Sequence, residues 1–216
     1  APLLGVEIVT LNKYMTTENI ILGFEQYVDD TTELSPAQEL ALANKIYRKI
    51  LDAKPWEFLK KEFIGTTTGS TTVTLPADFK FMLPTYGYTD STTDQGGLYV
   101  FIGSTLKPYK VVNWSDRKQY ITTSQVCYLD IVNGNLVFTV APDSGLTISF
   151  DYIYRPDDLA LDTSPVFPAE YHPAIYHGMA TEDYIIQQFD KARSYAAENQ
   201  AMYKNYLADL GAYNSQ

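Results

Sequence analysis

Residues 35–62 read SPAQELALANKIYRKILDAKPWEFLKKE, a helix start signal followed by a helical repeat and a stop. Ser35 stands at the N-cap position, Pro36 at the first helical position, and Gln38 completes a capping box. Apolar residues then recur every three or four positions: Leu40, Ala43, Ile46, Tyr47, Ile50 and Leu51. Pro55 stops or kinks this helix, and we expect the WEFLKKE segment to add one or two further turns.

A shorter helix is predicted upstream, over residues 17–28. Thr17 is its expected N-cap, because threonine accepts a hydrogen bond from a helix-terminal amide. Its apolar residues fall on one helical face: Ile20, Ile21, Phe24, Tyr27 and Val28.

From residue 66 the apolar period changes from 3.6 to 2, which is typical of β-strands. Alternating segments bounded by turn formers occupy residues 71–75, 98–102, 107–114, 126–132, 134–141 and 146–155. Asn133-Gly134 predicts a two-residue type I′ hairpin turn, because this pair accepts positive φ angles. We expect an antiparallel sandwich or barrel-like domain of about six or seven short strands.

Helical spacing returns towards the C-terminus. Apolar residues stand at steps of three, four or seven residues, which keep to one helical face: Ile175, Met179, Ile186, Phe189, Ala192, Ala196, Tyr203, Leu207 and Leu210. This pattern fits one long helix, or two helices joined near Phe189-Asp190. We therefore predict an α+β fold, with residues 1–64 and 165–216 as a terminal helical bundle and residues 65–164 as an inserted antiparallel β domain.

The composition excludes several classes of protein. Of the 216 residues, 45% are hydrophobic and 19% are charged, as in ordinary globular domains. No apolar run reaches the roughly 18 residues that a membrane span needs. Cys127 is the single cysteine, so neither a disulfide within the chain nor a thiolate zinc site can form, and we expect it to be a small buried residue. The net charge of -10 opposes tight binding to nucleic-acid phosphates.

Both histidines lie in EYHPAIYHGMATEDY, residues 170–184. Histidine pairs that hold a metal on a helix are normally about four residues apart. His172 and His177 are five apart in sequence, which turns their directions about 140° away from each other. Pro173 belongs in the first helical turn, so His172 lies outside the regular helix. We interpret the stretch as a helix start rather than a metal or acid–base site.

Other residue combinations give no catalytic signal. Asp157, Asp158 and Asp162 are close in sequence but lack the spacing of a calcium loop, so we interpret them as part of a solvated linker. The sequence contains no G-x-S-x-G, P-loop or dinucleotide-binding motif. Trp56 lies beside Phe58 and is expected in the core. We expect no enzyme activity, no catalytic or metal-binding residues and no cofactor.

Three segments, in this order, resemble the head-to-tail adaptor (neck) proteins of tailed bacteriophages, the group that includes tail tubular protein A. Pro55-Trp56 ends the helical opening, LPADF at residues 75–79 opens the β region, and FPAEYH at residues 167–172 opens the last helical region. The resemblance covers most of the chain. Pro173 departs from the family pattern, and residues 1–16 have no counterpart in it.

The resemblance implies a structural virion protein, made in the host cytoplasm and placed in the neck between capsid vertex and tail. Such adaptors form rings of twelve that bind the portal protein and a tail-tube or nozzle protein, while the genome passes through the centre without sequence-specific binding or any membrane. Twelve copies would carry about 120 net negative charges, and an acidic lumen lets DNA slide during ejection. The alternative is a tail-associated glycan- or host-binding β module, because aromatic side chains can stack on sugars.

Two partner surfaces are expected. Tyr206, Leu210 and Tyr213 form an apolar end with little sequence left to cover it, and such patches mark partner sites. The resemblance suggests that this helical end binds the portal, so removing residues 206–216 should leave a folded chain that no longer binds it. It also suggests that the loop over residues 89–97 faces the tail, through Thr89, Asp90, Asp94 and Gln95.

Overall fold

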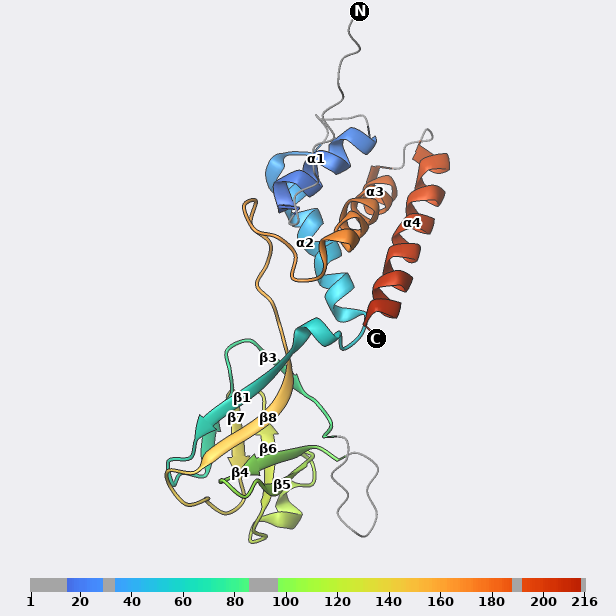
Figure 1. Ribbon diagram of the computed structural model, residues 1–216. Helices are drawn as coiled ribbons and strands as arrows, with labels where there is room; N and C mark the ends of the chain where they lie inside the picture. The colour runs from blue at the N-terminus through green and yellow to red at the C-terminus, as the bar shows by residue number, and fades with distance from the viewer. Residues whose placement is uncertain (1–14, 29–33, 86–96, 188–191, 215–216) are drawn as a thin grey trace, which may run out of the picture. The chain divides into compact units, whose positions relative to one another are not determined.

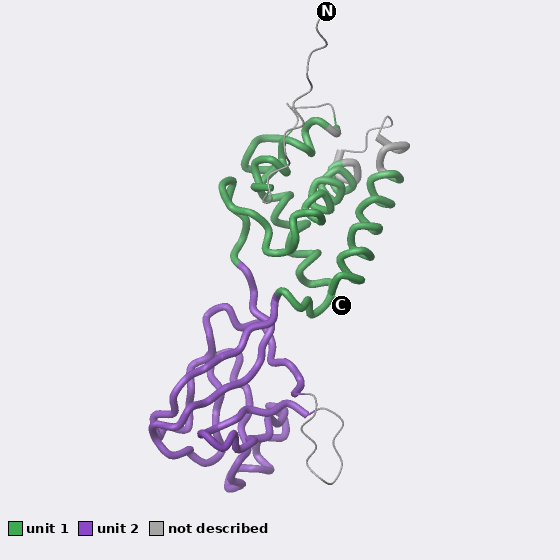
Figure 2. Tube along the Cα trace, viewed as in Figure 1, with its two compact units in different colours: residues 1–58, 157–216 green, residues 59–156 purple. Residues whose placement is uncertain are grey.

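The computed structural model confirms the α+β class (Figure 1). It describes residues 15–28, 34–85, 97–187 and 192–214. The chain divides into two compact units, coloured separately in Figure 2. We call residues 1–58 with 157–216 the helical unit and residues 59–156 the β unit.

The described part of the helical unit contains four α-helices, and α3 contacts each of the others. Their bounds are Thr17–Val28 (α1), Pro36–Asp52 (α2), Pro173–Gln187 (α3) and Ala192–Tyr213 (α4), with short 3-10 helices at Glu57–Leu59 (η1) and Ala169–Tyr171 (η3). The C-terminal region therefore forms two helices, the second of the two arrangements that its sequence allows. Buried apolar side chains from all four helices form the core of this unit, among them Ile20, Phe24, Ile46, Ile50, Met179 and Leu210.

α2 begins where the sequence predicts. Ser35 is its N-cap and Pro36 its first residue. Gln38 Oε1 accepts hydrogen bonds from the amide and the hydroxyl of Ser35, at 2.8 and 2.9 Å. Trp56, beyond the end of the helix, is 1% exposed, and its Nε1 donates to the carbonyl oxygen of Ile50 at 2.7 Å. Its predicted place in the core is confirmed.

α1 begins one residue earlier than predicted. Thr17 is its first residue, and the Asn19 amide donates to Thr16 Oγ1 at 3.4 Å, so the capping side chain belongs to Thr16. Thr17 is fully buried instead. Its amide and its hydroxyl both donate to the carbonyl oxygen of Thr163, at 2.8 and 2.9 Å. The prediction of Thr17 as N-cap is therefore wrong by one position.

The β unit contains one curled mixed sheet in the order β1-β8-β4-β5-β6-β7-β2, with β3 also paired to β8. The strands are Lys60–Thr66 (β1), Thr72–Thr74 (β2), Phe79–Met82 (β3), Tyr99–Ile102 (β4), Lys107–Val112 (β5), Val126–Asp130 (β6), Asn135–Phe138 (β7) and Thr147–Tyr154 (β8). Its core includes Val100, Leu136, Ile148, Phe150 and the fully buried Cys127, so the predicted burial of the cysteine is confirmed.

The expectation of one or two further helical turns after Pro55 is right only for the short 3-10 helix Glu57–Leu59 and is wrong from Lys60, because residues 60–66 form β1. β1 pairs along its length with β8, placing Phe63 opposite Phe150 with ring centroids 4.8 Å apart. A side chain at Gly65 would come within 2.8 Å of the Phe63 ring, so only glycine lets that ring lie there. Pairing with the distant strand β8 thus outweighs the helical tendency of the charged residues that follow Trp56.

The sheet is not wholly antiparallel as predicted, since β5 and β6 run parallel. The residues between them, 113–125, do not make a hairpin. They contain the 3-10 helix η2 (Arg117–Tyr120) and return the chain so that Val126, the first residue of β6, lies opposite Lys110 of β5. Parallel neighbours need such a crossover, because a two-residue turn can join only antiparallel strands.

β6 and β7 form the predicted hairpin, but its turn is longer than predicted. Pairing ends at Asp130 and Asn135, which leaves residues 131–134 as a four-residue loop. The Asp130 carboxylate accepts hydrogen bonds from the amide and Nδ2 of Asn133, at 3.3 and 2.8 Å. In this loop the positive φ, 65°, belongs to Gly134. The two-residue type I′ prediction is therefore wrong, because Asp130 holds Asn133 in another turn.

Candidate functional site

The net charge of the chain is divided unequally between the two units. The helical unit carries eight Lys and Arg against eighteen Asp and Glu, a formal charge of -10. The β unit carries eight of each and is formally neutral. The sequence predicts that the negative charge of the chain repels nucleic-acid phosphates. Because the β unit is neutral, only the helical unit is expected to have this effect.

The two histidines are buried at different places in the helical unit. His172 precedes α3, as predicted, and its Nε2 lies 2.9 Å from the carbonyl oxygen of Phe167. His177 Nδ1 lies 2.8 Å from Asn199 Oδ1 on α4, and its ring stacks on Tyr206 with centroids 5.7 Å apart. Burial lowers the pKa of both rings. His177 thus connects α3 to α4, and His172 is bonded within the segment that leads into α3, in agreement with a helix start.

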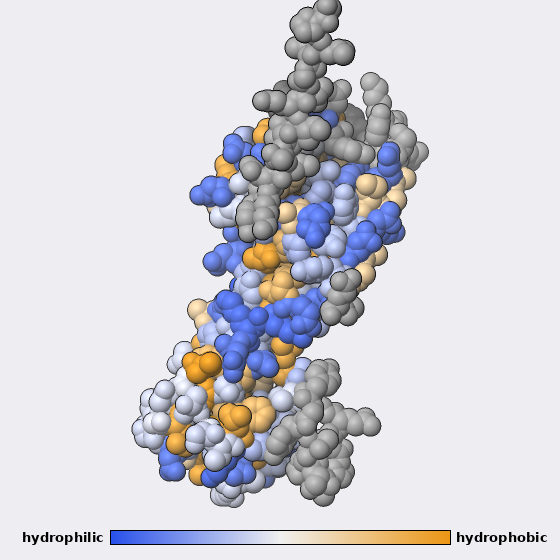
Figure 3. Space-filling model, viewed as in Figure 1, coloured by the Kyte–Doolittle hydropathy of each residue, from blue (hydrophilic) through white to orange (hydrophobic). Residues whose placement is uncertain are grey.

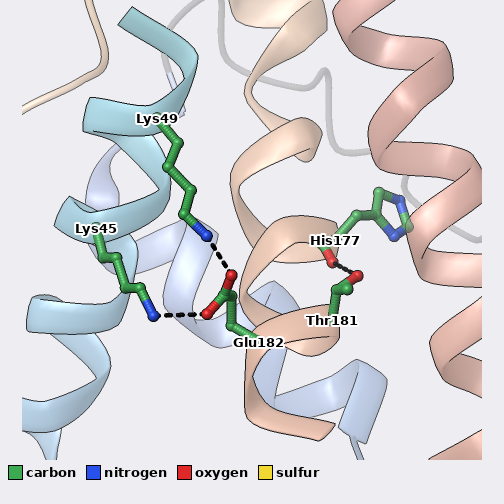
Figure 4. A network of polar contacts seen from close by, with 5 residues as sticks. All are labelled: Lys45, Lys49, His177, Thr181 and Glu182. Atoms are coloured by element: carbon green, nitrogen blue, oxygen red, sulfur yellow. Dashed lines mark hydrogen bonds and ion pairs between the residues drawn. The ribbon is translucent and has the colours of Figure 1, made fainter. Parts of the chain in front are cut away.

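The acidic residue Glu182 of the same stretch joins α3 to α2. Lys45 Nζ donates to Glu182 Oε2 at 2.6 Å, and Lys49 Nζ donates to the other carboxylate oxygen. These hydrogen bonds lower the pKa of Glu182. Figure 4 shows both lysines pointing at Glu182 from α2, with the His177 ring turned away towards α4. The Lys45–Lys49 spacing of four places both charges on one helical face, a signal the sequence analysis missed.

The predicted apolar end of α4 is only partly a surface. Leu210 is fully buried, so it cannot contact a partner, and the prediction of an uncovered patch is wrong for this residue. The segment around it is held by Lys54 Nζ, which donates to the Gly211 carbonyl oxygen at 3.2 Å. Tyr213 is 45% exposed and contacts Tyr171 at 6.0 Å between centroids. Tyr206 is half-buried. A role for the two tyrosines in portal binding stays a prediction.

The predicted tail-facing loop lies largely outside the described residues, including Thr89, Asp90, Asp94 and Gln95. The described β unit instead exposes an aromatic residue that the sequence analysis did not select. Trp114, in the crossover between β5 and β6, is 47% exposed. The guanidinium of Arg117 lies 3.7 Å from the centroid of its ring, and the Tyr128 ring meets it edge-on at 5.3 Å. In Figure 3, hydrophobic residues reach this unit's surface among hydrophilic ones.

The aspartate-rich stretch over residues 157–166 is fixed to the helical unit rather than a loose linker. Asn44 on α2 binds the backbone of Leu159 on both sides, accepting from its amide at 2.7 Å and donating to its carbonyl at 3.0 Å. Arg48 pairs with Asp158 at 2.6 Å. The expectation of a solvated linker is thus wrong for the backbone, although the side chains of Asp157 and Asp162 are exposed.

The LPADF element has a structural role in the β unit. Asp78 accepts hydrogen bonds from Lys61 Nζ on β1 at 2.7 Å and from the Tyr152 hydroxyl on β8 at 3.0 Å. Burial alone would raise the pKa of Asp78, but these two hydrogen bonds outweigh it and lower the pKa. Burial and the same hydrogen bond raise the pKa of Tyr152 to about 12. One carboxylate therefore ties β1 and β8 to the start of β3.

Within the described residues, no three His, Cys, Asp or Glu side chains come together in a way that could hold a metal ion. Across the same part of the chain, no helix has the length and apolar character to cross a membrane. The candidate functional features of the described residues are therefore the exposed surfaces around Tyr213 and Trp114 and the contacts between helices.

Comparison with known proteins identifies the family. The model of the family described as SU10 adaptor protein matches residues 15–216. No curated protein matches the sequence. The chain therefore belongs to the SU10 adaptor protein family, which confirms the resemblance to phage head-to-tail adaptors. Membership indicates a structural protein of the phage virion that interacts with other virion components.

Proposed function

Because the chain belongs to a family of phage adaptor proteins, we propose that it forms the neck ring joining the portal to the tail. Twelve copies surround the channel through which DNA leaves the capsid. The role is structural, and the chain acts through contacts with neighbouring copies, the portal and a tail-tube or nozzle protein.

The charge of the helical unit supports this proposal. A ring of twelve places about 120 negative charges on its helical units, since each unit carries -10 and the β unit adds none. DNA that passes close to such units is repelled rather than bound, because no excess of basic residues is there to displace its counterions. A channel needs this property, whereas a DNA-binding protein needs the opposite.

The portal-binding surface of this proposal differs from the one expected from the sequence alone. Tyr213 and Met202 on α4 are exposed to 45% and 37%, and both are apolar enough to contribute to a protein interface. We assign the portal contact to this exposed side of α4, without Leu210. The tail contact stays with the loop of residues 89–97.

The glycan-binding alternative finds less support in the β unit. Sugar recognition by an aromatic side chain uses an open ring face. One face of Trp114 is covered by the Arg117 guanidinium, 3.7 Å from the ring centroid. The other tryptophan, Trp56, is 1% exposed and lies in the helical unit.

Electron microscopy of the purified chain, alone and mixed with portal rings of its phage, tests the proposal. We expect rings that decorate one face of the portal. Native mass spectrometry that gives only monomers or trimers, together with bare portals in the micrographs, would refute it and favour a binding module.

A further inference from the structure

The β unit carries a preorganised protein-binding surface, which we call the Trp114 patch and define as Trp114, Arg117, Lys118 and Ile121. Trp114 and Ile121 are exposed to 47% and 64%. Arg117 is fixed twice, by its stacking on Trp114 and by the bond from Nη1 to the Trp114 carbonyl oxygen. The Tyr128 ring also contacts the indole, edge-on. Tryptophan, tyrosine and arginine are the residues that most often dominate binding energy at interfaces, and fixing them beforehand reduces the entropy lost on binding.

The patch is basic within a neutral unit. Its two charged members, Arg117 and the exposed Lys118, are both basic, and one acidic residue, Asp116, stands next to them in the sequence. A partner of matching chemistry is therefore acidic, with apolar side chains for Trp114 and Ile121 to cover.

The helical unit offers a surface of this chemistry, the stretch of residues 157–166. Leu161 and Val166 are exposed to 46% and 39%, and the aspartates at 157 and 162 are exposed beside them. The stretch is held in place by Asn44, by Arg48 and by the bonds of Thr17 to Thr163. It thus combines exposed apolar and acidic side chains on a backbone that is already ordered.

We propose that the Trp114 patch of one copy binds residues 157–166 of a second copy. Two different surfaces then meet at each contact, and such a head-to-tail contact closes into a ring when its rotation allows. The inference rests on the proposed ring and names the surfaces that build it. It uses charge complementarity between a basic patch and a unit that carries -10.

Zero-length crosslinking of isotope-mixed protein tests this contact directly. Equal amounts of ¹⁵N-labelled and unlabelled chain are mixed and treated with a carbodiimide, which joins a lysine amine to a carboxylate. We expect crosslinked peptides that pair Lys118 with Asp157 or Asp162 and that contain one heavy and one light partner. Crosslinks at these positions in which both partners always share one label, or no such crosslinks, would overturn the inference.

A second test of this contact reverses the charges of the two surfaces in separate variants. Arg117→Glu with Lys118→Glu makes the patch acidic, and Asp157→Lys with Asp162→Lys makes the stretch basic. Each variant should self-associate at least about tenfold more weakly than the wild type, whereas an equimolar mixture should assemble because every mixed contact again pairs opposite charges. Circular dichroism verifies that each variant is folded.

Matched reversals elsewhere provide the controls. Lys60→Glu with Arg155→Glu, and Asp52→Lys with Glu57→Lys, change the same charges at other exposed positions of the two units. They should assemble as the wild type does. If the variants with a reversed Trp114 patch or a reversed 157–166 stretch each assemble into rings without the other variant, this contact is refuted but the proposed ring is not. A wild-type chain that forms no ring, even on portals, would instead refute the proposed function.

Discussion

At Gly178 on α3 a side chain would meet a closer neighbour than at any other described glycine, and replacing this residue with alanine gives a sharp test of the fold. A Cβ at residue 178 would lie 2.5 Å from Ile46 Cγ2 on α2 and 3.3 Å from the Tyr203 ring on α4. Contact becomes ordinary at 3.4 Å, so Ile46 or α3 itself must move by about 0.9 Å. α3 therefore approaches both neighbours at a point where only glycine fits.

The expected magnitude is the difference of two effects. Alanine favours a helix over glycine by about 1 kcal/mol. Overpacking a filled core costs about 1–3 kcal/mol. We expect Gly178→Ala to lower the free energy of unfolding of the helical unit by up to about 2 kcal/mol, which lowers the melting temperature by up to roughly 8 °C in a chain of this size.

Gly23 on α1 provides the matched control. A Cβ there would lie 3.4 Å from the Tyr176 ring, an ordinary contact, so Gly23→Ala should stabilise the chain by up to about 1 kcal/mol. Urea unfolding followed by far-ultraviolet circular dichroism measures both variants. Ile46→Leu removes the Cγ2 methyl group and should recover part of the loss in the Gly178→Ala background. A Gly178→Ala chain as stable as Gly23→Ala would refute the close approach of α2 and α3.

Three further changes test other contacts. Asp78→Asn should cost about 1 kcal/mol at neutral pH. The folded-state pKa of Asp78 is lowered, so its stabilising effect is present above the ordinary value of 3.8, and the difference from wild type in urea unfolding should shrink as the pH falls below it. Ser35→Ala should cost only about 0.5 kcal/mol in the same assay, because the amide of Ser35 keeps its bond to Gln38. Tyr213→Ala should weaken binding to portal rings at least about fivefold in sedimentation assays, whereas Leu22→Ala, equally exposed on α1, should not.

The parts of the fold that the sequence predicts are those specified by neighbouring residues. Ser35, Pro36 and Gln38 are enough to start α2, since a capping box is a contact within four residues. Pro173 likewise marks the first residue of α3. The alternation of residues 126–138 gives the β6–β7 hairpin, although the side chain of Asp130 then changes its turn.

The parts that the sequence does not predict depend on distant partners. Lys60, Lys61 and Glu62 of β1 form a strand because β8, which follows them by about ninety positions, pairs with them. Leu210 is buried in a segment that Lys54 and the Glu57 amide hold, through their hydrogen bonds to Gly211 and Asn214. The parallel pairing of β5 and β6 creates the crossover that presents Trp114. These contacts cannot be predicted from the apolar periodicity of any single segment.

The separation of charge between the units leads to a final prediction about salt. A ring built only from contacts between helical units would bring surfaces of -10 together, and added salt would strengthen it by screening their repulsion. A contact between the basic Trp114 patch and residues 157–166 joins opposite charges, and added salt weakens it. Screening acts over about 10 Å at 0.1 M salt and about 3 Å at 1 M, so sedimentation across this range separates the two cases. We expect the rings to loosen as salt rises. Rings that tighten steadily with salt would place the dominant contact between helical units and would contradict the role of the patch.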